Sequence, residues 1–399
     1  MRILFLMLQL PEEHKGGGMY VDLAEQFKKN NHEVTIMAPD NNHARTYICQ
    51  ERGMRVLRVN SKATQGVANM IQKGFALAML PRYYKKAFDH HLSSEKFDWI
   101  IMPTPPITLS GFVDYVKKRT DAKFYLILRD IHPQSVWSIG LLHNRLEYYF
   151  LDRKARMGYD SADLIGCMSQ GNIDFIAREY PYLNQKKLVI LYNWLKSNGG
   201  LSKAYEVRQK FGLQDKYVVL FGGTIGKGQR IENIVFLANY YLNNNNIAFV
   251  IIGKGVEKER LELIAKKKNL TNILFIDFMP QEDYLHFVSS VDLGLITINE
   301  HYAVPTCPSK AISYMSLGIP IFAMINPQSD YGQWIEDAGA GYWTVGADSE
   351  RTIKLFDKLY TDADLRKRMG QQGRNYYLEN CTEVKAYETM IRQMYNIGK

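Results

Sequence analysis

The sequence predicts an α/β protein with two domains, each built on a parallel sheet that helices cover on both faces. Short apolar runs alternate with amphipathic helical patterns in the first half of the chain, and the same alternation returns in the second half. This alternation is typical of parallel sheets, because a helix usually connects two parallel strands. The chain has 399 residues, 46% of them hydrophobic, which is enough for two domains with their own cores.

The apolar runs give the order of the expected elements. In the first half, strands are expected at 3–9, 33–39, 99–103, 124–130 and 163–169, with a helix at 21–31. In the second half, strands are expected at 217–223, 247–255, 273–277, 293–298 and 319–325, with a helix at 231–242. Asn, Ser and two Gly residues at 192–202 indicate a joint between two Rossmann-like domains that face each other across a cleft.

Charge is concentrated in one segment of the first half. The chain has a formal net charge of +9, and residues 45–96 contain ten basic and three acidic side chains. Within this segment Arg82, Lys85 and Lys86 alternate with the aromatic residues Tyr84 and Phe88, a pattern suited to the headgroup layer of an anionic membrane. An ordinary amphipathic helix that packs on its own domain is the alternative. No nucleic-acid recognition motif accompanies the basic residues.

Other features of the sequence limit the class of protein. No apolar run reaches the length of about 18 residues that a membrane span needs, and the N-terminal segment lacks a signal-peptide cleavage site. It is expected to form a first buried strand. Four cysteines, at positions 49, 167, 307 and 381, have neither disulfide-framework nor zinc-site spacing, and they suit a reducing cytoplasm.

A glycine-rich loop at 222–228 follows a predicted strand and precedes a predicted helix. Glycines let backbone amides approach an anion, the helix N-terminus adds partial positive charge, and Lys227 adds a full charge. The loop therefore suits a phosphate. Its spacing matches neither G-x-G-x-x-G nor the P-loop pattern. A tight turn with a solvated lysine is the alternative for this loop taken alone.

Several segments, in order along the chain, resemble one known family. They are the opening strand with residues 16–39, and then LILRDIHPQSV (126–136), ADLIGCMS (162–169), FGGTIGKG (221–228), VIIGKG (250–255), FIDFMP (275–280) and PSKAISYMSLGIPIF (308–322). Together they resemble a family 4 retaining glycosyltransferase of the two-domain GT-B fold. Enzymes of this type build bacterial surface polysaccharides, such as capsule and O-antigen, on a lipid carrier.

The resemblance implies a reaction, partners and a domain layout. A hexose would pass from a nucleotide-diphosphate sugar, expected to carry UDP, to a lipid-linked saccharide with retention of configuration. No metal or cofactor is implied, and the protein would work in the cytoplasm at the inner face of the membrane. The acceptor domain would span 1–195, the donor domain 196–380, and a final helix at 381–399 would cross back to the first domain. The only Asp-x-Asp, at 362–364, lies in a polar helical stretch.

The resemblance also assigns a donor site. The diphosphate would lie in the loop at 223–228, with Lys227 and Lys310 as the cations, and the base would lie against Ile252 and Gly253. For each lysine a solvated surface charge is the alternative. The full set of expected donor-binding residues is Gly17, Gly18, Gly223, Thr224, Gly226, Lys227, Ile252, Gly253, Phe278, Met279, Ser309, Lys310 and Ser313.

The chain departs from the family at two positions. Many members have two glutamates eight positions apart, and here Pro305 and Ser313 occupy those positions. Ser313 can still give one hydrogen bond to a ribose hydroxyl. Glu300 could replace the first glutamate, or it could be an exposed loop acid.

Two residues of the first domain are candidates for catalysis. Asp130 and His132 follow a buried strand, where family members place an acid or a histidine close to the transferring sugar. Asp130 could stabilise the developing positive charge, and His132 could take the acceptor proton. The structural alternatives are that Asp130 caps the following turn and that His132 packs in the turn before Pro133.

Three other functions compete with this hypothesis. A nucleotide-sugar 2-epimerase shares the fold and would convert a nucleotide sugar without an acceptor. A non-catalytic nucleotide-sugar-binding protein stays open because the glutamate pair is missing. A dinucleotide oxidoreductase is disfavoured by the spacing of both glycine-rich loops. The three expected membrane or acceptor contacts are Arg82, Lys85 and Lys86.

Overall fold

The chain forms two compact units. In the computed structural model, unit 1 comprises Met1–Tyr192 with Glu383–Lys399, and unit 2 comprises Asn193–Thr382. The structure describes residues 1–13, 17–40, 43, 45–61, 70–197, 204–347 and 349–397. Gly16 of the first glycine run and residues 198–202 of the predicted joint lie outside the described residues.

An eight-stranded sheet forms the centre of unit 1. Its strands lie in the order β3-β4-β2-β1-β5-β6-β7-β8, and all pairs are parallel except β3 with β4. The strands are β1 (Arg2–Leu6), β2 (Glu33–Asp40), β3 (Tyr47–Glu51), β4 (Met54–Asn60), β5 (Trp99–Pro103), β6 (Lys123–Leu128), β7 (Leu164–Cys167) and β8 (Leu188–Ile190). Each strand expected from an apolar run in the first half is present.

The antiparallel edge of this sheet departs from the expected all-parallel sheet. Strands β3 and β4 form a hairpin whose turn residues, Arg52 and Gly53, both have positive φ, 53° and 64°. Two such residues suit the right-handed twist of paired strands. Exposed and partly buried residues alternate along β3. The strand therefore has no continuous apolar run from which it could be predicted.

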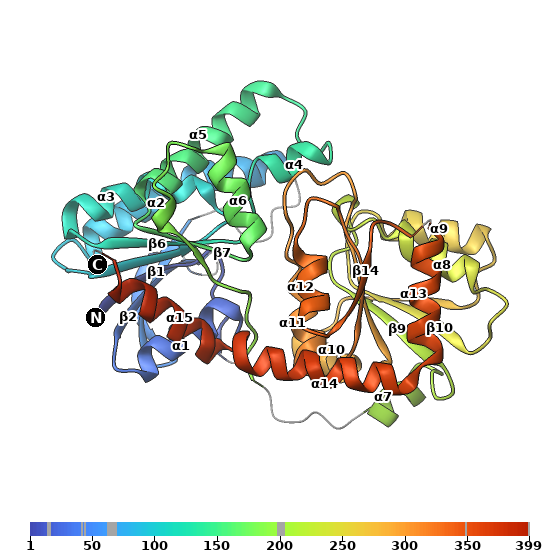
Figure 1. Ribbon diagram of the computed structural model, residues 1–399. Helices are drawn as coiled ribbons and strands as arrows, with labels where there is room; N and C mark the ends of the chain where they lie inside the picture. The colour runs from blue at the N-terminus through green and yellow to red at the C-terminus, as the bar shows by residue number, and fades with distance from the viewer. Residues whose placement is uncertain are drawn as a thin grey trace. The chain divides into compact units, whose positions relative to one another are not determined.

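Helices cover both faces of the unit 1 sheet (Figure 1). Helices α2, α3, α5 and α6 lie on one face, while α1 and α15 lie on the other. Their bounds are α1 (Met19–Lys29), α2 (Met70–His91), α3 (Ser110–Thr120), α4 (Gln134–Ser138), α5 (Arg145–Ser161), α6 (Gln170–Glu179) and α15 (Glu383–Tyr395). The C-terminal helix α15 packs on α1, where the rings of Phe27 and Tyr387 meet edge to face at 5.0 Å.

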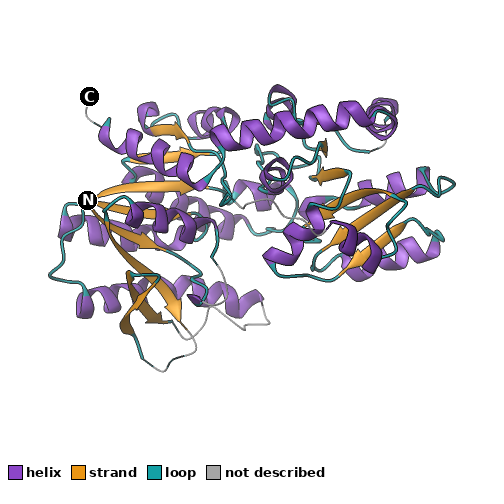
Figure 2. Cartoon of the chain, turned by 90° about the horizontal axis from the view of Figure 1, so that it is seen from below, coloured by secondary structure: helices purple, strands orange, loops and turns teal. Residues whose placement is uncertain are grey.

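Unit 2 contains a six-stranded parallel sheet with helices on both faces (Figure 2). The strands lie in the order β11-β10-β9-β12-β13-β14. They are β9 (Tyr217–Gly222), β10 (Ile247–Ile252), β11 (Ile273–Ile276), β12 (Leu293–Thr297), β13 (Ile321–Met324) and β14 (Gly341–Thr344). The helices are α7 (Ala204–Lys210), α8 (Glu232–Tyr240), α9 (Lys258–Lys267), α10 (Gln281–Val288), α11 (Lys310–Ser316), α12 (Tyr331–Asp337), α13 (Glu350–Thr361) and α14 (Ala363–Asn380).

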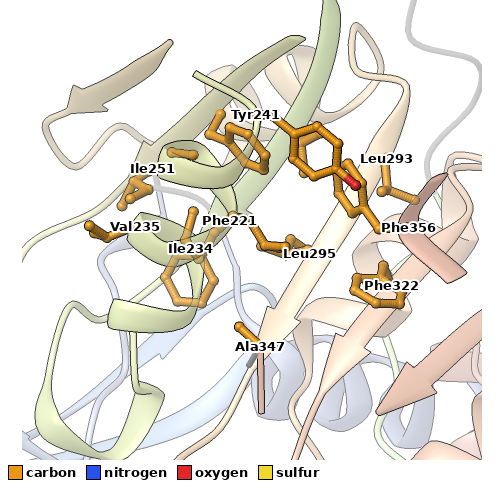
Figure 3. Packing of buried hydrophobic residues seen from close by; sticks show 14 of the residues in the cluster. Phe221, Ile234, Val235, Tyr241, Ile251, Leu293, Leu295, Phe322, Ala347 and Phe356 are labelled. Carbon is orange, nitrogen blue, oxygen red and sulfur yellow. The ribbon is translucent and has the colours of Figure 1, made fainter. Parts of the chain in front are cut away.

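Aromatic and branched aliphatic side chains fill one face of the unit 2 sheet (Figure 3). Phe356 of α13 is fully buried and lies against three rings, those of Tyr241, Phe249 and Phe322. Phe221, near the end of β9, is part of the same cluster. Burying a side chain of this size contributes about 1.5–3 kcal/mol, so the carboxyl end of β9 is firmly anchored.

The strand order identifies where a ligand should bind in each sheet. Strands β9 and β12 are neighbours in the sheet. The chain continues from β9 to β10 on one side and from β12 to β13 on the other, so the two connections run in opposite directions. In unit 1 the same divergence occurs between β1 and β5. Ligands of open α/β sheets bind at the carboxyl ends of strands at such a switch point.

Candidate functional site

The loop after β9 is held in place by the loop after β10. Gly223 N donates to Ile252 O at 2.9 Å, and Ile225 N donates to Lys254 O at the same distance. A Cβ on Gly253 would come within 1.8 Å of Gly223 O. Gly253 also has a φ of +156°, so two independent reasons require glycine there. The glycine pattern read from the sequence thus produces a fixed backbone path.

The glycine loop does not lead directly into a helix. A 3₁₀ turn at Lys227–Gln229 follows it, Arg230 takes a left-handed conformation, and α8 begins only at Glu232. Thr224 and Lys227 are exposed, and Gly226 is partly exposed. The carbonyl of Lys227 accepts a hydrogen bond from Asn299 Nδ2 at 3.1 Å, which joins this turn to the loop after β12.

Lys310 is a cation that lies beside the glycine loop. It is the first residue of α11, and its Nζ donates to Gln229 Oε1 at 2.5 Å and lies 4.3 Å from the ring centre of Phe221. Among the described residues, no carboxylate lies within ion-pairing distance of this Nζ. Burial lowers the pKa of Lys310 to about 7. A largely buried ammonium with one neutral hydrogen-bond partner is ready to receive an anion.

Buried polar side chains hold the segment that leads to Lys310. Asn326 is fully buried, and its Nδ2 donates to Tyr302 O and Val304 O at 3.1 and 3.0 Å. The hydroxyl of Tyr331 donates to Pro308 O at 2.7 Å. These bonds satisfy carbonyls of an irregular segment that no strand or helix could pair. The position of Lys310 is therefore set by the sheet behind it.

The two positions expected to hold glutamates have no acid to offer. Pro305 is buried and Ser313 is partly buried. Glu300, the possible replacement, forms an ion pair with Arg230, whose Nη2 lies 3.2 Å from Oε1. Glu300 is partly buried and paired, so it is not a fully exposed loop acid, and its replacement of the first glutamate stays a prediction.

The remaining expected donor contacts of unit 2 lie at its strand ends. Ile252 is buried, Met279 is partly buried, and Ser309 is exposed at the start of α11. Phe278 is 64% exposed, and Lys254 Nζ lies 4.8 Å above its ring. The sequence reasoning missed Lys254 and also Gln229, the partner of Lys310. Their roles depend on contacts between loops distant in sequence.

Gly17 and Gly18 belong to unit 1, whereas the other expected donor contacts belong to unit 2. Gly18 precedes α1, and its carbonyl accepts a hydrogen bond from Asp22 N at 2.9 Å. The contact of both glycines with a donor stays a prediction.

A second polar group follows β6 in unit 1. His132 Nδ1 and Ser135 Oγ are 2.9 Å apart, and His132 Nε2 lies 4.0 Å from Asp130 Oδ2. Burial lowers the pKa of His132, and the neighbouring carboxylate of Asp130 opposes that shift. Pro133 is the N-cap of α4, and the cap has no side-chain hydrogen bond. Asp130 is therefore not a helix cap, and its side chain is 57% exposed.

Arg129 fixes the backbone before these residues. Its guanidinium is buried and donates to Leu191 O at 3.1 Å, while its amide donates to Thr104 Oγ1 at 3.2 Å. Burial raises the pKa of Tyr20, and Arg129 beside it opposes the shift. Neither Ser135 nor Tyr20 was identified from the sequence.

The structure agrees with one part of the prediction for the basic segment on α2 and contradicts another. Arg82, Lys85 and Lys86 are exposed, in agreement with a surface role. Tyr84 and Phe88, expected to dip into a membrane, are instead fully buried against the sheet, so that part of the prediction is wrong. Both side chains lie on the face of α2 that packs against the sheet. The sequence periodicity predicts an apolar helix face, but it does not predict whether the protein core or a membrane covers that face.

The described residues contain neither a membrane-spanning helix nor a metal-binding cluster. None of their helices is long and apolar enough to span a membrane. Across the same ranges, no group of three or more His, Cys, Asp or Glu side chains is arranged to hold a metal ion. Asp362, of the Asp-x-Asp segment, caps α14 by accepting a hydrogen bond from Leu365 N at 2.8 Å.

Comparison with known proteins gives a family match within unit 2. Residues 204–376 match the model of the family described as "Glycosyl transferases group 1". The chain is 23% identical to the "Probable glycosyltransferase WbjE" of Pseudomonas aeruginosa over 295 residues, 73% of this chain and 72% of that protein. A shorter match, 27% identical over 131 residues, joins it to WcaI of Escherichia coli, provisionally named a colanic acid biosynthesis glycosyl transferase. That match covers 33% of this chain and 32% of WcaI.

Solved structures share the fold over almost the whole chain. Sucrose-phosphate synthase of Thermosynechococcus elongatus matches with a TM-score of 0.75 and 14% identity, covering 99% of both chains. HepE of Anabaena, solved in complex with UDP and glucose, matches with a TM-score of 0.69 and 12% identity over 99% of both chains. At this identity the likeness shows the fold, which is the two-domain α/β GT-B fold.

Proposed function

We propose that this chain, whose residues 204–376 match the group 1 glycosyltransferase model, transfers a hexose from UDP to a lipid-linked saccharide during assembly of a cell-surface polysaccharide. The similarity to WcaI, named for colanic acid biosynthesis, supports a polysaccharide of the capsule or O-antigen type. The UDP complex of HepE supports the nucleotide. Membership of family 4 and retention of the anomeric configuration belong to the same proposal.

The observation that carries the proposal is the environment of Lys310. A largely buried ammonium without a carboxylate partner is costly to maintain unless an anion completes its environment. Its Nζ would lie 3.7 Å from a Cβ built on Gly223, at the glycine loop after β9. The diphosphate of a nucleotide sugar supplies the missing charge, and Gly223, Thr224 and Gly226 let it approach the backbone.

The other donor contacts follow from this placement. The base lies against the backbone of Ile252 and Gly253, close to Phe278 and Met279. Ser309 and Lys310 at the start of α11 bind the phosphates, and Ser313, one turn later, binds a ribose hydroxyl. Lys227 adds a second positive charge from the exposed turn after the glycine loop. We propose no resident metal or cofactor, because the two lysines neutralise the departing diphosphate.

In unit 1, Asp130 and His132 act on the transferring sugar and the acceptor. The exposed carboxylate of Asp130 stabilises positive charge at the anomeric carbon as the bond to the diphosphate breaks. The lowered pKa of His132 keeps its imidazole neutral at pH 7. With Nδ1–H donating to Ser135 Oγ, Nε2 is free to take the proton of the acceptor hydroxyl.

The direct test is a thermal-shift screen against nucleoside diphosphates and their sugars. A ligand that binds the folded chain raises its midpoint of unfolding by mass action. We expect stabilisation by UDP and UDP-hexoses, and loss of that stabilisation in Lys310→Ala but not in Lys266→Ala, whose side chain is exposed on α9. A parent protein that no nucleotide stabilises would overturn the proposal.

Turnover assays then separate the competing activities. Incubation with a UDP-hexose alone distinguishes transfer from epimerisation, because an epimerase converts the sugar without an acceptor. Adding a lipid-linked saccharide should release UDP and lengthen the acceptor by one sugar. UDP binding without either reaction would point to a non-catalytic nucleotide-sugar-binding protein.

A further inference from the structure

The hairpin formed by α4 and α5 exposes a cluster of large apolar side chains. We call this cluster the apolar tip, and its members are Trp137, Leu141, Leu146, Tyr149 and Phe150. Leu146, Tyr149 and Phe150 are 79%, 69% and 51% exposed, and their spacing places them on one side of the first two turns of α5. In Figure 1 this part of α5 extends away from the sheet of unit 1.

The hairpin is firmly attached to unit 1, so the exposure does not come from a loose segment. One face of the second half of α5 is buried, including Ala155 and Tyr159. Asp152 Oδ1 accepts the hydroxyl of Tyr180 at 2.8 Å, and the same hydroxyl accepts Gln134 Nε2 of α4 at 2.7 Å. A rigid helix thus presents the apolar tip to its surroundings. Exposed apolar clusters of this kind mark contact sites.

Basic residues surround the apolar tip. Arg145 and Arg153 are exposed on α5, and Lys154 Nζ lies 5.6 Å from the ring centre of Phe150. Glu147 is the exposed acid among them. Helix α5 packs on α3, and α3 packs on α2, which carries the exposed Arg82, Lys85 and Lys86. One helical layer of unit 1 therefore combines an apolar tip with two groups of cations.

We propose that the apolar tip docks on an anionic lipid bilayer and inserts its leucines and aromatic rings below the headgroups. Trp and Tyr favour this interface, and Arg and Lys at its edge bind lipid phosphates. A second copy of the chain is a poorer occupant, because a two-fold contact through this patch would bring its cations together. The inference rests on the proposed function in one respect, since a lipid-linked acceptor gives the docking its purpose.

The position of the hairpin gives the docking a consequence for the reaction. Helix α4 begins two residues after His132, and its first side chain, Gln134, is tied to α6 through Tyr180. When the apolar tip is docked, Asp130 and His132 therefore lie at a fixed distance from the bilayer surface. A sugar attached to a membrane lipid lies at that same surface.

The test measures how much of the full-length chain sediments with vesicles made of equal parts phosphatidylcholine and phosphatidylglycerol. The variant carries Leu146→Asp and Phe150→Asp, and the matched control carries Leu263→Asp and Tyr240→Asp at exposed positions of unit 2. Both variants add the same charge. We expect the first variant to lose vesicle affinity by about tenfold or more, and the control to bind like the parent within about twofold. Leu146→Asp places an acid in the first turn of α5, which suits the helix, and Phe150 is exposed, so folding should be kept.

Four outcomes overturn the inference. They are a parent that does not bind vesicles, unchanged vesicle affinity of the Leu146→Asp/Phe150→Asp variant, an equal loss in the control, and a parent dimer that this variant dissociates. A dimer would make the patch an interface between copies. UDP stabilisation, measured on the same samples, keeps the two proposals apart. A parent that binds UDP but not vesicles refutes the docking alone, and one that binds vesicles but no nucleotide refutes the proposed function alone.

Discussion

The candidate sites of the two units are built from different parts of the chain. In unit 2 the glycine loop is shaped by backbone hydrogen bonds from Gly223 N to Ile252 O and from Ile225 N to Lys254 O, with a partly buried cation, Lys310, beside it. In unit 1 the polar group after β6 consists of side chains, with His132 held by Ser135. A site made of backbone is sensitive to steric changes at its glycines, whereas a site made of side chains is sensitive to their chemistry. Substitutions in the two units should therefore fail in different ways.

The largest effect is expected at Gly253, where the two loops of unit 2 touch. The Gly253→Ala substitution places a Cβ 1.8 Å from Gly223 O, so one of two hydrogen-bonded loops must move. We expect a loss of about 3–5 kcal/mol in the free energy of unfolding, together with loss of UDP binding. Urea denaturation followed by tryptophan fluorescence measures the first quantity.

Gly346→Ala is the matched control for this substitution. Gly346 also has a positive φ, +69°, but a Cβ there would meet nothing within 4 Å. Its replacement should cost about 1 kcal/mol, the strain of a left-handed alanine alone. Equal losses at both positions would show that backbone strain, and not the contact between the loops, explains the effect of Gly253→Ala.

Loss of Lys310 should damage the chemical step more than any other side-chain truncation in unit 2. Negative charge on the diphosphate grows as the sugar leaves, and a buried cation stabilises it strongly. We expect Lys310→Ala to cost about 2–4 kcal/mol in kcat/KM, with part of the loss in UDP affinity. Steady-state rates beside calorimetric UDP titration give both numbers. Parent-like rates and affinity would remove Lys310 from the site.

Asp130 tests the side-chain site of unit 1. The Asp130→Asn substitution keeps the shape of the side chain and removes its charge, so kcat should fall by about 2 kcal/mol, roughly thirtyfold, while UDP affinity stays unchanged. The control is Asp174→Asn, the same substitution at an exposed position of α6, which should leave both quantities unchanged. Near-normal turnover of Asp130→Asn would exclude the residue from the mechanism.

Much of the fold could be predicted because parallel strands are buried on both faces. Runs such as residues 247–252 are continuously apolar, and they became β10 and its neighbours. The sequence reasoning missed β3, β4, β8 and β14. Three of them, β3, β8 and β14, lie at sheet edges, where one side meets solvent. In β4, two arginines interrupt the apolar residues, so it has no continuous apolar run. The Arg52–Gly53 turn was also missed, since arginine is not a residue that usually marks such a hairpin.

Some residues of the candidate site could also be predicted from the sequence, and others could not. Glycine positions could be predicted because a loop that crosses another loop closely needs them, as Gly253 and Gly255 do. Gln229 and Ser135 could not, because each acts through one contact, to Lys310 and His132. Nothing in the local pattern around a glutamine or serine reports such a partner.

The pKa of Lys310, about 7, makes UDP affinity depend on pH. Below pH 7 the ammonium is charged before UDP binds. Above pH 7 binding must take up a proton, so affinity should fall with pH, by at most tenfold for each pH unit, or about 1.4 kcal/mol. In Lys310→Arg the charge persists, and the decline between pH 7 and 9 should flatten. An equally steep decline in both proteins would contradict a role for Lys310 ionisation.

The same shift has a consequence for stability without ligand. Between pH 7 and the ordinary lysine value of 10.5, the unfolded chain holds more protons at Lys310 than the folded chain. This residue therefore makes the free energy of unfolding rise with pH across that window. Lys310→Met should stabilise the unliganded protein at pH 6 and have little effect near pH 10.5, which thermal unfolding at the two pH values will measure.

The smallest effect is expected for Lys227, the exposed counterpart of Lys310. Its side chain is solvated, so a phosphate contact there exchanges one hydrated charge for another and is screened by salt. We expect Lys227→Ala to cost about 0.5–1 kcal/mol in UDP affinity at low ionic strength, and less at high salt. Calorimetry at two salt concentrations measures the difference, with Lys266→Ala as the control for a distant exposed lysine. A loss as large as that of Lys310→Ala would show that the 3₁₀ turn closes over the diphosphate and buries Lys227 when the donor binds.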